Sequence, residues 1–481
     1  MSVLATANRL LRNTGLSVVG SVVGRLASSV FFILISRSYG VEVSGTFSIA
    51  LSYYYLGSRL SFWGLDHLLT REVARAPAEL DRYLSNFLPL RAALGALSLS
   101  VVGLIILRSG YDGETKALIL IVALSIWFES IGNLCQAVFV AFEELEYLAL
   151  IAVVVGGGKL LLAILLRNSG ILVLAGAFSA SNLVGMLIGL WLALRRSRFA
   201  LSHFDWRTSL VQLRIALPFF FIATFFILDN RTDVILLSAL SPKYEIGLYS
   251  AAVAVIAALS MIPQGFRTSI YPLLARYQAS SQTATLKLYT SASKYLFVFS
   301  LPVAVGVTVL AEDVIRVLYG PSFAEAAGLL QVAVWSFFTY SMTVLNSRML
   351  IVHDQQRKLS LFLLGSSLVT IAANVLLVPR IGILGAAIAK VMSSVTLWLL
   401  GHRAVAAIAG PTNLWGSAWR AVVACVAMVQ CVRISDPLGW SAQMLIGGIA
   451  YIIALLAVGG FSKEELSVWR AVVGHQLARL R

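Results

Sequence analysis

The chain alternates between apolar runs of about twenty residues and shorter polar segments that carry most of its charges. A helix needs about 20 apolar residues to cross the hydrocarbon core of a bilayer. Strands of a membrane barrel would instead alternate at every second residue over about ten residues, which these runs do not. The pattern therefore predicts an all-α polytopic membrane protein with about fourteen transmembrane helices. The predicted spans are 15–36, 45–68, 84–107, 117–140, 147–166, 170–194, 215–239, 246–270, 293–311, 326–350, 360–379, 383–401, 417–433 and 441–460.

The composition excludes the soluble classes of protein. Hydrophobic residues make up 59% of the chain and charged residues 12%, whereas a soluble domain has about 25% charged residues. Soluble cores could not bury so much apolar surface, which excludes a soluble enzyme, a disordered chain and a fibrous repeat. The first apolar run is too long for a cleavable signal peptide. The cysteines and histidines have no metal-ligand spacing, so we expect no metal, and we expect no nucleic-acid partner for a chain of this class.

The distribution of Lys and Arg predicts the orientation in the membrane. An even number of spans places both termini on one side, and the loops of that side carry most of the cations, including Arg82, Arg91 and the basic segment 195–214. Because cytoplasmic loops are enriched in Lys and Arg, we expect both termini in the cytoplasm. Segments 204–214 and 463–481 are apolar on one face and cationic on the other, which predicts amphipathic helices at the inner membrane surface.

Two short segments recur in the second half of the chain. Residues 45–50 (GTFSIA) resemble residues 247–252 (GLYSAA), and residues 170–172 resemble residues 382–384. Each second copy lies six spans after the first, and an even shift preserves orientation, which predicts parallel repeats about an axis along the membrane normal. The predicted units are a six-helix N-terminal lobe (1–200), a six-helix C-terminal lobe (201–405), and two additional helices with an amphipathic cytoplasmic tail (406–481).

Charged residues inside the predicted spans are the candidate functional groups, because a charge at the bilayer centre costs at least about 2.5–3.5 kcal/mol. Arg348 and Arg420 lie near span ends and can extend their side chains to the interface. Other charges can cancel in pairs, for example Glu129 with Lys159. The cations still outnumber the acids, and this excess predicts a water-filled cationic cavity for an anionic substrate. The intramembrane cations are Arg25, Arg59, Lys159, Arg231, Arg267, Arg348, Lys390 and Arg420, and the acids are Asp66, Glu129, Asp229 and Asp233.

Two further patterns bear on the source of energy. Residues 153–160 (VVVGGGKL) lack the first glycine and the final Ser or Thr of a phosphate-binding loop and lie inside a span, so we predict no ATPase and no cofactor. Asp229 and Asp233 lie one helical turn apart on one face of the seventh span. Together with Glu129 they are candidates for coupling to H⁺ or Na⁺. The alternative is that both aspartates are permanently paired with cations from other spans.

Five blocks of the sequence, in order between about residues 10 and 405, resemble one family of membrane proteins. The blocks are Ser36-Arg37-Ser38-Tyr39-Gly40 with 45–47, Gly64-Leu65-Asp66 with Arg71-Glu72, 141–147, 229–233 with 245–249, and Asn374, Pro379 and 382–387. The family is that of the polysaccharide-type lipid-linked oligosaccharide flippases, the Wzx group of the multidrug/oligosaccharidyl-lipid/polysaccharide exporter superfamily. Phe31 and Thr46 depart from the pattern of the related lipid II flippases, so we do not expect lipid II as the substrate.

The resemblance implies a transporter, not an enzyme, in which two lobes give alternating access. Similar proteins carry undecaprenyl-diphosphate-linked oligosaccharides from the cytoplasmic to the periplasmic leaflet of the bacterial inner membrane. The glycans serve surface polysaccharides such as lipopolysaccharide O-antigen or exopolysaccharide, and a glycan polymerase is an expected partner beside membrane lipids. The alternative is a cation-coupled multidrug antiporter of the same superfamily, against which the excess of cations argues.

The candidate substrate-binding residues combine the resemblance with the intramembrane charges. The resemblance implies substrate-binding arginines at Arg25 and Arg59, and more loosely at Arg267 in the eighth span. The guanidinium group binds phosphate oxygens with two parallel hydrogen bonds, which suits a diphosphate. The other candidates, which are implied by their depth in the membrane, are Lys159, Arg231 and Lys390.

Overall fold

The computed structural model describes residues 3–199, 204–410 and 415–460. Side chains are not described for 3–19, 217–219, 221–231 and 415–417 or for several single residues, including Arg25. The predicted tail at 463–481 lies outside the described residues. The described regular structure consists of helices without strands, which confirms the all-α prediction. We call the end of the bundle at which the first helix begins the inner end and the opposite end the outer end, after the predicted topology.

The first helix, α1 (Val3–Phe62), is 60 residues long and contains a kink at Gly40, where φ is 80°. A straight helix of this length would extend over about 90 Å, far more than the hydrocarbon core of about 30 Å. A positive φ is readily available only to glycine. Gly40 therefore turns the chain at the outer end, and the two arms of α1 correspond to the predicted spans 15–36 and 45–68.

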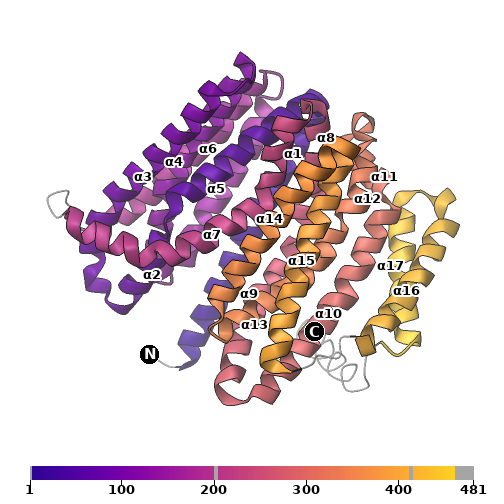
Figure 1. Cartoon of the computed structure of the whole chain (residues 1–481). Coiled ribbons are helices and arrows are strands. Elements are labelled where there is room, and N and C mark those ends of the chain that lie inside the picture. The colour runs from indigo at the N-terminus through magenta and orange to yellow at the C-terminus, as the bar shows by residue number, and fades with distance from the viewer. Residues whose placement is uncertain (1–2, 200–203, 411–414, 461–481) are drawn as a thin grey trace, which may run out of the picture.

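Both arms of α1 and the helices up to residue 194 form an N-terminal group, drawn from indigo to purple in Figure 1. Within this group α1 packs along α5, and α4 packs against α6 and α3. The members after α1 are α2 (Leu65–Arg75), the short η1 (Pro77–Glu79), α3 (Leu80–Arg108), α4 (Gly113–Ala141), α5 (Leu145–Leu165) and α6 (Ile171–Leu194).

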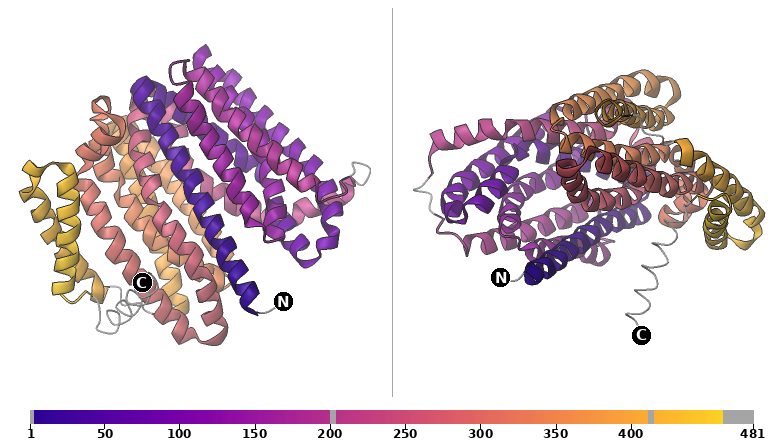
Figure 2. Two further views of the ribbon diagram at one scale, coloured as in Figure 1. Left: turned by 180° about the vertical axis from the view of Figure 1, so that it is seen from behind. Right: turned by 90° about the horizontal axis from the view of Figure 1, so that it is seen from below.

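A second group, drawn from magenta to orange, follows along the chain (Figure 1). Its helices are α7 (Trp206–Leu240), α8 (Lys243–Leu259), α9 (Met261–Ser280), α10 (Gln282–Val309), α11 (Ala311–Tyr319), α12 (Ala326–Ala333), α13 (Trp335–Val352), α14 (Gln356–Ile381) and α15 (Ile383–Ala409), with η3 (Pro321–Phe323). The last two helices, α16 (Trp415–Ile434) and α17 (Trp440–Ala457), form a hairpin with η4 (Asp436–Leu438). They lie at the periphery of the second group, against α10 (Figure 2).

The observed helices agree with most of the predicted spans. Eleven stretches of the described residues are long and apolar enough to cross a membrane, and the two arms of α1 count there as one. Helices α7 and α16 coincide with the predicted seventh and thirteenth spans. The predicted span 246–270 is a pair of helices, α8 and α9, that meet at Ser260. The amphipathic segment 204–214 is not a separate interfacial helix, because from Trp206 onward it forms the first turns of α7.

Helix α7 connects the two groups. At its inner end the Asp205 N–H and the Ser209 hydroxyl donate to the Asn86 side-chain oxygen, at 2.8 and 3.3 Å, and Trp63 stacks on Phe220 at 4.7 Å between ring centroids. Towards its outer end α7 packs along α14 of the second group. Figure 1 shows α7 running diagonally from the first group to the second.

The two recurring glycines meet at the outer end. A Cβ atom on Gly45 would lie 2.0 Å from the Lys243 carbonyl oxygen, and one on Gly247 would lie 2.0 Å from the Val41 carbonyl oxygen. Gly45 thus faces Lys243, four residues before Gly247, and Gly247 faces Val41, four residues before Gly45. Such a reciprocal contact is expected where a twofold axis passes between two equivalent helices. The second arm of α1 and the start of α8 therefore touch backbone to backbone.

The glycine run before Lys159 is regular helix within α5. A Cβ on Gly156 would lie 3.0 Å from the Ala27 Cβ and 3.3 Å from the Gly24 Cα, so the small residues let α1 and α5 approach closely. This packing role accounts for the run without any phosphate-binding loop.

Cysteines at Gly110 and Ala76 test the predicted orientation. Both positions are exposed in loops at opposite ends of the bundle, after α3 and α2. We expect Gly110→Cys to react with a membrane-impermeant maleimide added to intact cells, and Ala76→Cys to react only after permeabilisation. The half-buried Cys431 is replaced by Ser in both variants to remove background labelling. The opposite labelling pattern would overturn the assignment of cytoplasmic termini.

Candidate functional site

Arg59 lies near the inner end of the second arm of α1. Its guanidinium carbon is 5.7 Å from the centroid of the Phe62 ring, and the Arg91 guanidinium carbon is 5.5 Å from the same centroid. Arg59 is half-buried, and no acid of the described side chains lies within ion-pair distance of it. The aromatic ring offers it a weak electrostatic contact but leaves its five N–H donors available.

Arg91, which the Lys and Arg count places on the cytoplasmic side, is buried inside the bundle. Its side chain is 1% exposed, and its Nη2 lies 3.2 Å from the Asp66 Oδ2. The guanidinium also donates to the carbonyls of Ser130, Ser61 and Phe62. Arg91 therefore neutralises Asp66 and fixes the end of α1. The sequence signal for this burial was its position inside the predicted span 84–107.

Lys159 and Glu129 do not form the ion pair considered from the sequence. The Lys159 Nζ lies 4.1 Å from the Phe178 ring centroid, and the residue is 7% exposed. It lines a cavity of about 60 Å³ together with Ser28, Tyr54 and other residues. Glu129 instead accepts a hydrogen bond of 2.6 Å from the Ser58 hydroxyl. Lys159 therefore remains a buried cation without an acidic partner among the described residues.

Arg267 and Arg348 flank one tyrosine in the second group. Tyr271 lies one turn after Arg267 on α9, and the Arg348 guanidinium carbon, from α13, is 5.4 Å from the Tyr271 ring centroid. The Nε atoms of both arginines are buried without a hydrogen-bond partner among the described residues. These two cations lie beside one another, with no acid of the described residues at ion-pair distance. Together they form a site that favours binding of an anion.

Lys390 is neutralised by Asp233. The Lys390 Nζ lies 3.0 Å from the Asp233 Oδ2, and the Asp233 side chain is 2% exposed. The Tyr249 hydroxyl donates to the same carboxylate at 2.6 Å. This cluster joins α7, α15 and α8. The side chains of Asp229, Arg231 and Arg25 lie outside the described ones, so their partners stay predictions.

The structure thus places the described candidates in four locations. Arg59 and Glu129 lie between α1 and α4, Lys159 lies on α5 beneath Phe178 of α6, Arg267 lies on α9 beside Arg348, and Lys390 lies in the Asp233 cluster. Arg59, Lys159, Arg267 and Arg348 are the described candidates without an acidic partner, and the structure adds Arg348 to the predicted set.

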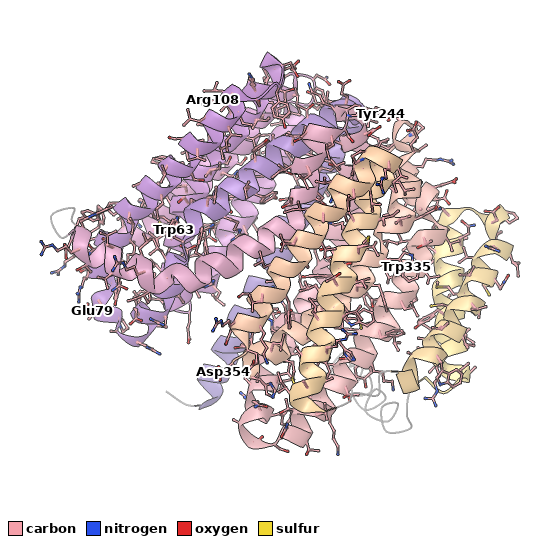
Figure 3. All side chains as sticks on the ribbon, viewed as in Figure 1. Trp63, Glu79, Arg108, Tyr244, Trp335 and Asp354 are labelled. Atoms are coloured by element: carbon pink, nitrogen blue, oxygen red, sulfur yellow. The ribbon has the colours of Figure 1, made fainter. Side chains whose placement is uncertain are left out.

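Polar contacts hold the two groups together at the outer end. The Arg37 Nε donates to the Leu318 carbonyl at 2.9 Å, across from α1 to the end of α11, and the Tyr111 hydroxyl donates to the Ser238 hydroxyl at 2.7 Å. Lys243 forms an ion pair with Asp112. Figure 3 shows Arg108 and Tyr244 at this end and Asp354 at the opposite end.

The Asp112 carboxylate is well stabilised in the ionised form. The hydrogen bond from Lys243 and the Thr115 N–H at the start of α4 hold the pKa of Asp112 well below its usual value. This contact between the two groups therefore persists across the physiological pH range.

Two helical groups that are joined at the outer end, with cations inside them that have no acidic partner among the described side chains, define an all-α membrane fold. Solved structures share it: a lipid II flippase, MurJ, in an inward closed conformation has a TM-score of 0.72 and 16% identity, covering 91% of this chain and 97% of that one. An inward-facing multidrug resistance MATE family transporter of the MOP superfamily has a TM-score of 0.67 and 15% identity, covering 80% and 95%.

A further structural relative is a MOP superfamily transporter from Pyrococcus furiosus, with a TM-score of 0.60, 17% identity and coverage of 83% and 96%. Residues 10–278 match the model of the polysaccharide biosynthesis protein family. Because the match covers more than half of the chain, the protein belongs to that family, which confirms the resemblance found in the sequence blocks. No curated protein sequence matches the chain significantly.

Proposed function

We propose that the protein moves undecaprenyl-diphosphate-linked oligosaccharides from the cytoplasmic to the periplasmic leaflet of the bacterial inner membrane by alternating access. The single observation that carries this proposal is the excess of unpaired intramembrane cations in a polysaccharide biosynthesis protein. Arg59, Lys159 and Arg267 lack acidic partners among the described residues, whereas Asp66 and Asp233 are already paired with cations. A buried, uncompensated positive charge favours an anionic substrate.

The diphosphate of the carrier lipid suits such a site. It carries at least two negative charges, and guanidinium groups bind phosphate oxygens with paired hydrogen bonds. The polyprenyl chain can stay in the bilayer while the charged headgroup crosses between the two groups of helices. The glycan would supply surface polysaccharides such as lipopolysaccharide O-antigen or exopolysaccharide, and an outer polymerase would consume it.

A cation-coupled multidrug antiporter is the second candidate. A cationic drug would need unpaired acids or open aromatic faces inside the protein. Among the described intramembrane acids, Asp66 and Asp233 form ion pairs and Glu129 accepts a hydrogen bond from Ser58. The described site therefore favours an anionic substrate over a cationic one.

Replacing Arg59 by alanine is the direct test. Charge-assisted hydrogen bonds contribute about 1.5–3 kcal/mol, so we expect Arg59→Ala to slow flipping of undecaprenyl-diphosphate-linked oligosaccharide in proteoliposomes by about ten- to a hundredfold. Arg25→Ala should act in the same direction. Arg59→Lys should restore only part of the rate, because the ammonium lacks the planar fork.

Arg108→Ala is the matched control for this test, because Arg108 is an exposed arginine at the outer end of α3. Each variant is first checked for wild-type thermal stability. Wild-type flipping by folded Arg59→Ala would contradict the proposal.

A further inference from the structure

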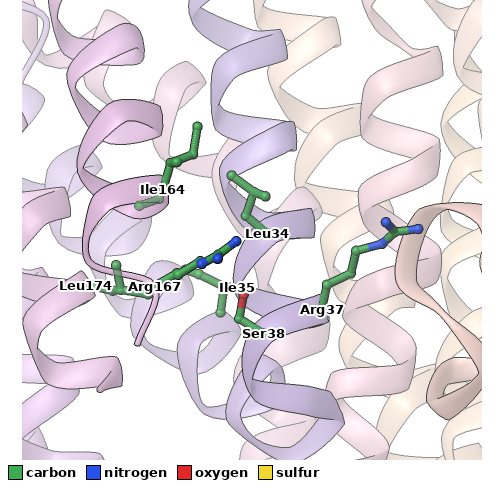
Figure 4. Close-up of a pocket in the computed structure, with 8 residues that line it drawn as sticks. Leu34, Ile35, Arg37, Ser38, Ile164, Arg167 and Leu174 are labelled. Carbon is green, nitrogen blue, oxygen red and sulfur yellow. The ribbon is translucent and has the colours of Figure 1, made fainter. Parts of the chain in front are cut away.

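A cavity of about 220 Å³ opens at the outer end of the first group, between α1, α5 and the start of α6. Figure 4 shows its lining, with Arg167 extending across it towards α1 and Arg37 pointing away. A single water needs about 10–15 Å³ of such space, so the cavity can hold a phosphate-sized group and the first carbons of a chain. The lining residues are Leu34, Ile35, Arg37, Ser38, Ala163, Ile164, Arg167 and Leu174.

The cavity combines an apolar wall with one available cation. Leu34, Ile35 and Leu174 supply much of the wall. Arg37 is committed to the carbonyls of α11, so it does not serve the cavity. Arg167 is exposed and has no hydrogen-bond or ion-pair partner among the described residues. Its guanidinium is therefore free to bind an anion at the mouth of an apolar space.

The surface beside the cavity is suited to hydrocarbon. On α5, Leu161, Ile164 and Leu165 are 58%, 55% and 67% exposed, and in a membrane-spanning helix such residues face lipid. Arg167 follows Leu166, the residue that caps α5, at the outer end of this apolar helix, where lipid headgroups are expected. A ligand seated here would have its charged end at Arg167 and its apolar part along α5.

We propose that this cavity binds the phosphate group of an outer-leaflet lipid, with the Arg167 guanidinium as the phosphate ligand and α5 as the support for the hydrocarbon chain. Two lipids share this chemistry: an anionic phospholipid of the bulk membrane and a polyprenyl phosphate carrier. The inference concerns a site on the outer surface of the first group, and it does not depend on the substrate proposed above.

The site also lies beside a contact between the two groups. Arg37, on the same turn of α1 as Ser38 of the cavity wall, holds the end of α11. A lipid bound at Arg167 would therefore rest against the segment of α1 that joins the groups at the outer end.

The test measures lipid retention by native mass spectrometry of the purified, delipidated full chain. The probes are phosphatidylglycerol, undecaprenyl phosphate, and diacylglycerol with the same acyl chains as the phospholipid but no phosphate. We expect the wild type to retain both phosphate lipids and not diacylglycerol. Arg167→Ala should weaken retention of the phosphate lipids by about tenfold, which corresponds to about 1.4 kcal/mol. Retention by Arg167→Lys should lie between that of the wild type and that of Arg167→Ala.

Arg108→Ala, at the outer end of α3, is the matched control and should retain lipid as the wild type does. In a competition at equal concentrations, displacement of phosphatidylglycerol by undecaprenyl phosphate would identify the carrier as the occupant, and the reverse would identify the phospholipid. Equal retention by Arg167→Ala and the wild type would overturn the proposal. Equal retention of diacylglycerol and the phosphate lipids by the wild type would also overturn it.

Discussion

Replacing Gly45 by alanine is expected to hold the outer end of the protein open. The added Cβ would lie 2.0 Å from the Lys243 carbonyl oxygen, and backbone atoms on both sides cannot rotate away from it as a side chain would. Overpacking of this kind costs about 1–3 kcal/mol, which changes the ratio of the closed to the open arrangement by about five- to 150-fold. Gly247→Ala should have the same effect, because the contact is reciprocal.

A single cysteine reports this opening. Ser48 is buried one turn further along the second arm of α1, and Ser48→Cys should react with an impermeant outer reagent only when the groups separate. Cys431, which is half-buried, is first replaced by Ser. Gly328→Ala is the control, because a Cβ there meets nothing within 4 Å. If Gly45→Ala leaves the Ser48→Cys labelling rate at the control level, this contact does not keep the outer end closed.

The Asp233–Lys390 pair should give the largest change in stability. Removing one partner of a buried ion pair costs about 3–5 kcal/mol, because the other charge is left without compensation. We therefore expect Asp233→Asn or Lys390→Met alone to lower the thermal unfolding temperature strongly. The double variant should recover most of the loss, since it leaves no buried charge behind. Single and double variants of equal stability would show that the two residues are not coupled.

We propose that the Asp233–Lys390 pair couples transport to an ion gradient, with Asp229 and Glu129 as further candidates for this coupling. The same variants test the proposal. In proteoliposomes an imposed proton or sodium gradient should change the flipping rate of the wild type but not that of the double variant. Glu144→Gln/Arg196→Gln removes an ion pair at the inner ends of α5 and α6 and should keep the gradient response. A wild-type rate that ignores both gradients would favour facilitated exchange driven by outer polymerisation.

The length of the apolar runs was sufficient to predict the helices, because the bilayer imposes one length on every span. It also predicted the two arms of α1 as separate spans, which the turn at Gly40 confirms. It could not show the break at Ser260 within the predicted span 246–270, because run length contains no information on neighbouring helices.

The charges illustrate the same limit at the candidate site. The sequence could predict that Asp233 pairs with a cation from another span or couples to an ion, but not that Lys390 is the partner, which requires α7, α8 and α15 to meet. The Glu129–Lys159 pair failed because Ser58 of α1 reaches the carboxylate while Lys159 packs against Phe178. The Asp66–Arg91 pair was not predicted, because the sequence does not show that α3 brings Arg91 to the end of α1.

The course of α7 has a consequence for how the chain can be divided. Its first turns cover the first group, where Ala216 packs in one apolar cluster with Leu68, Leu84 and Leu134, while its outer half belongs to the second group. A fragment that ended at residue 199 would leave that cluster uncovered, and a fragment that began at residue 204 would lack the surface that the first turns of α7 cover. A cut between residues 199 and 204 would therefore expose apolar surface on both fragments.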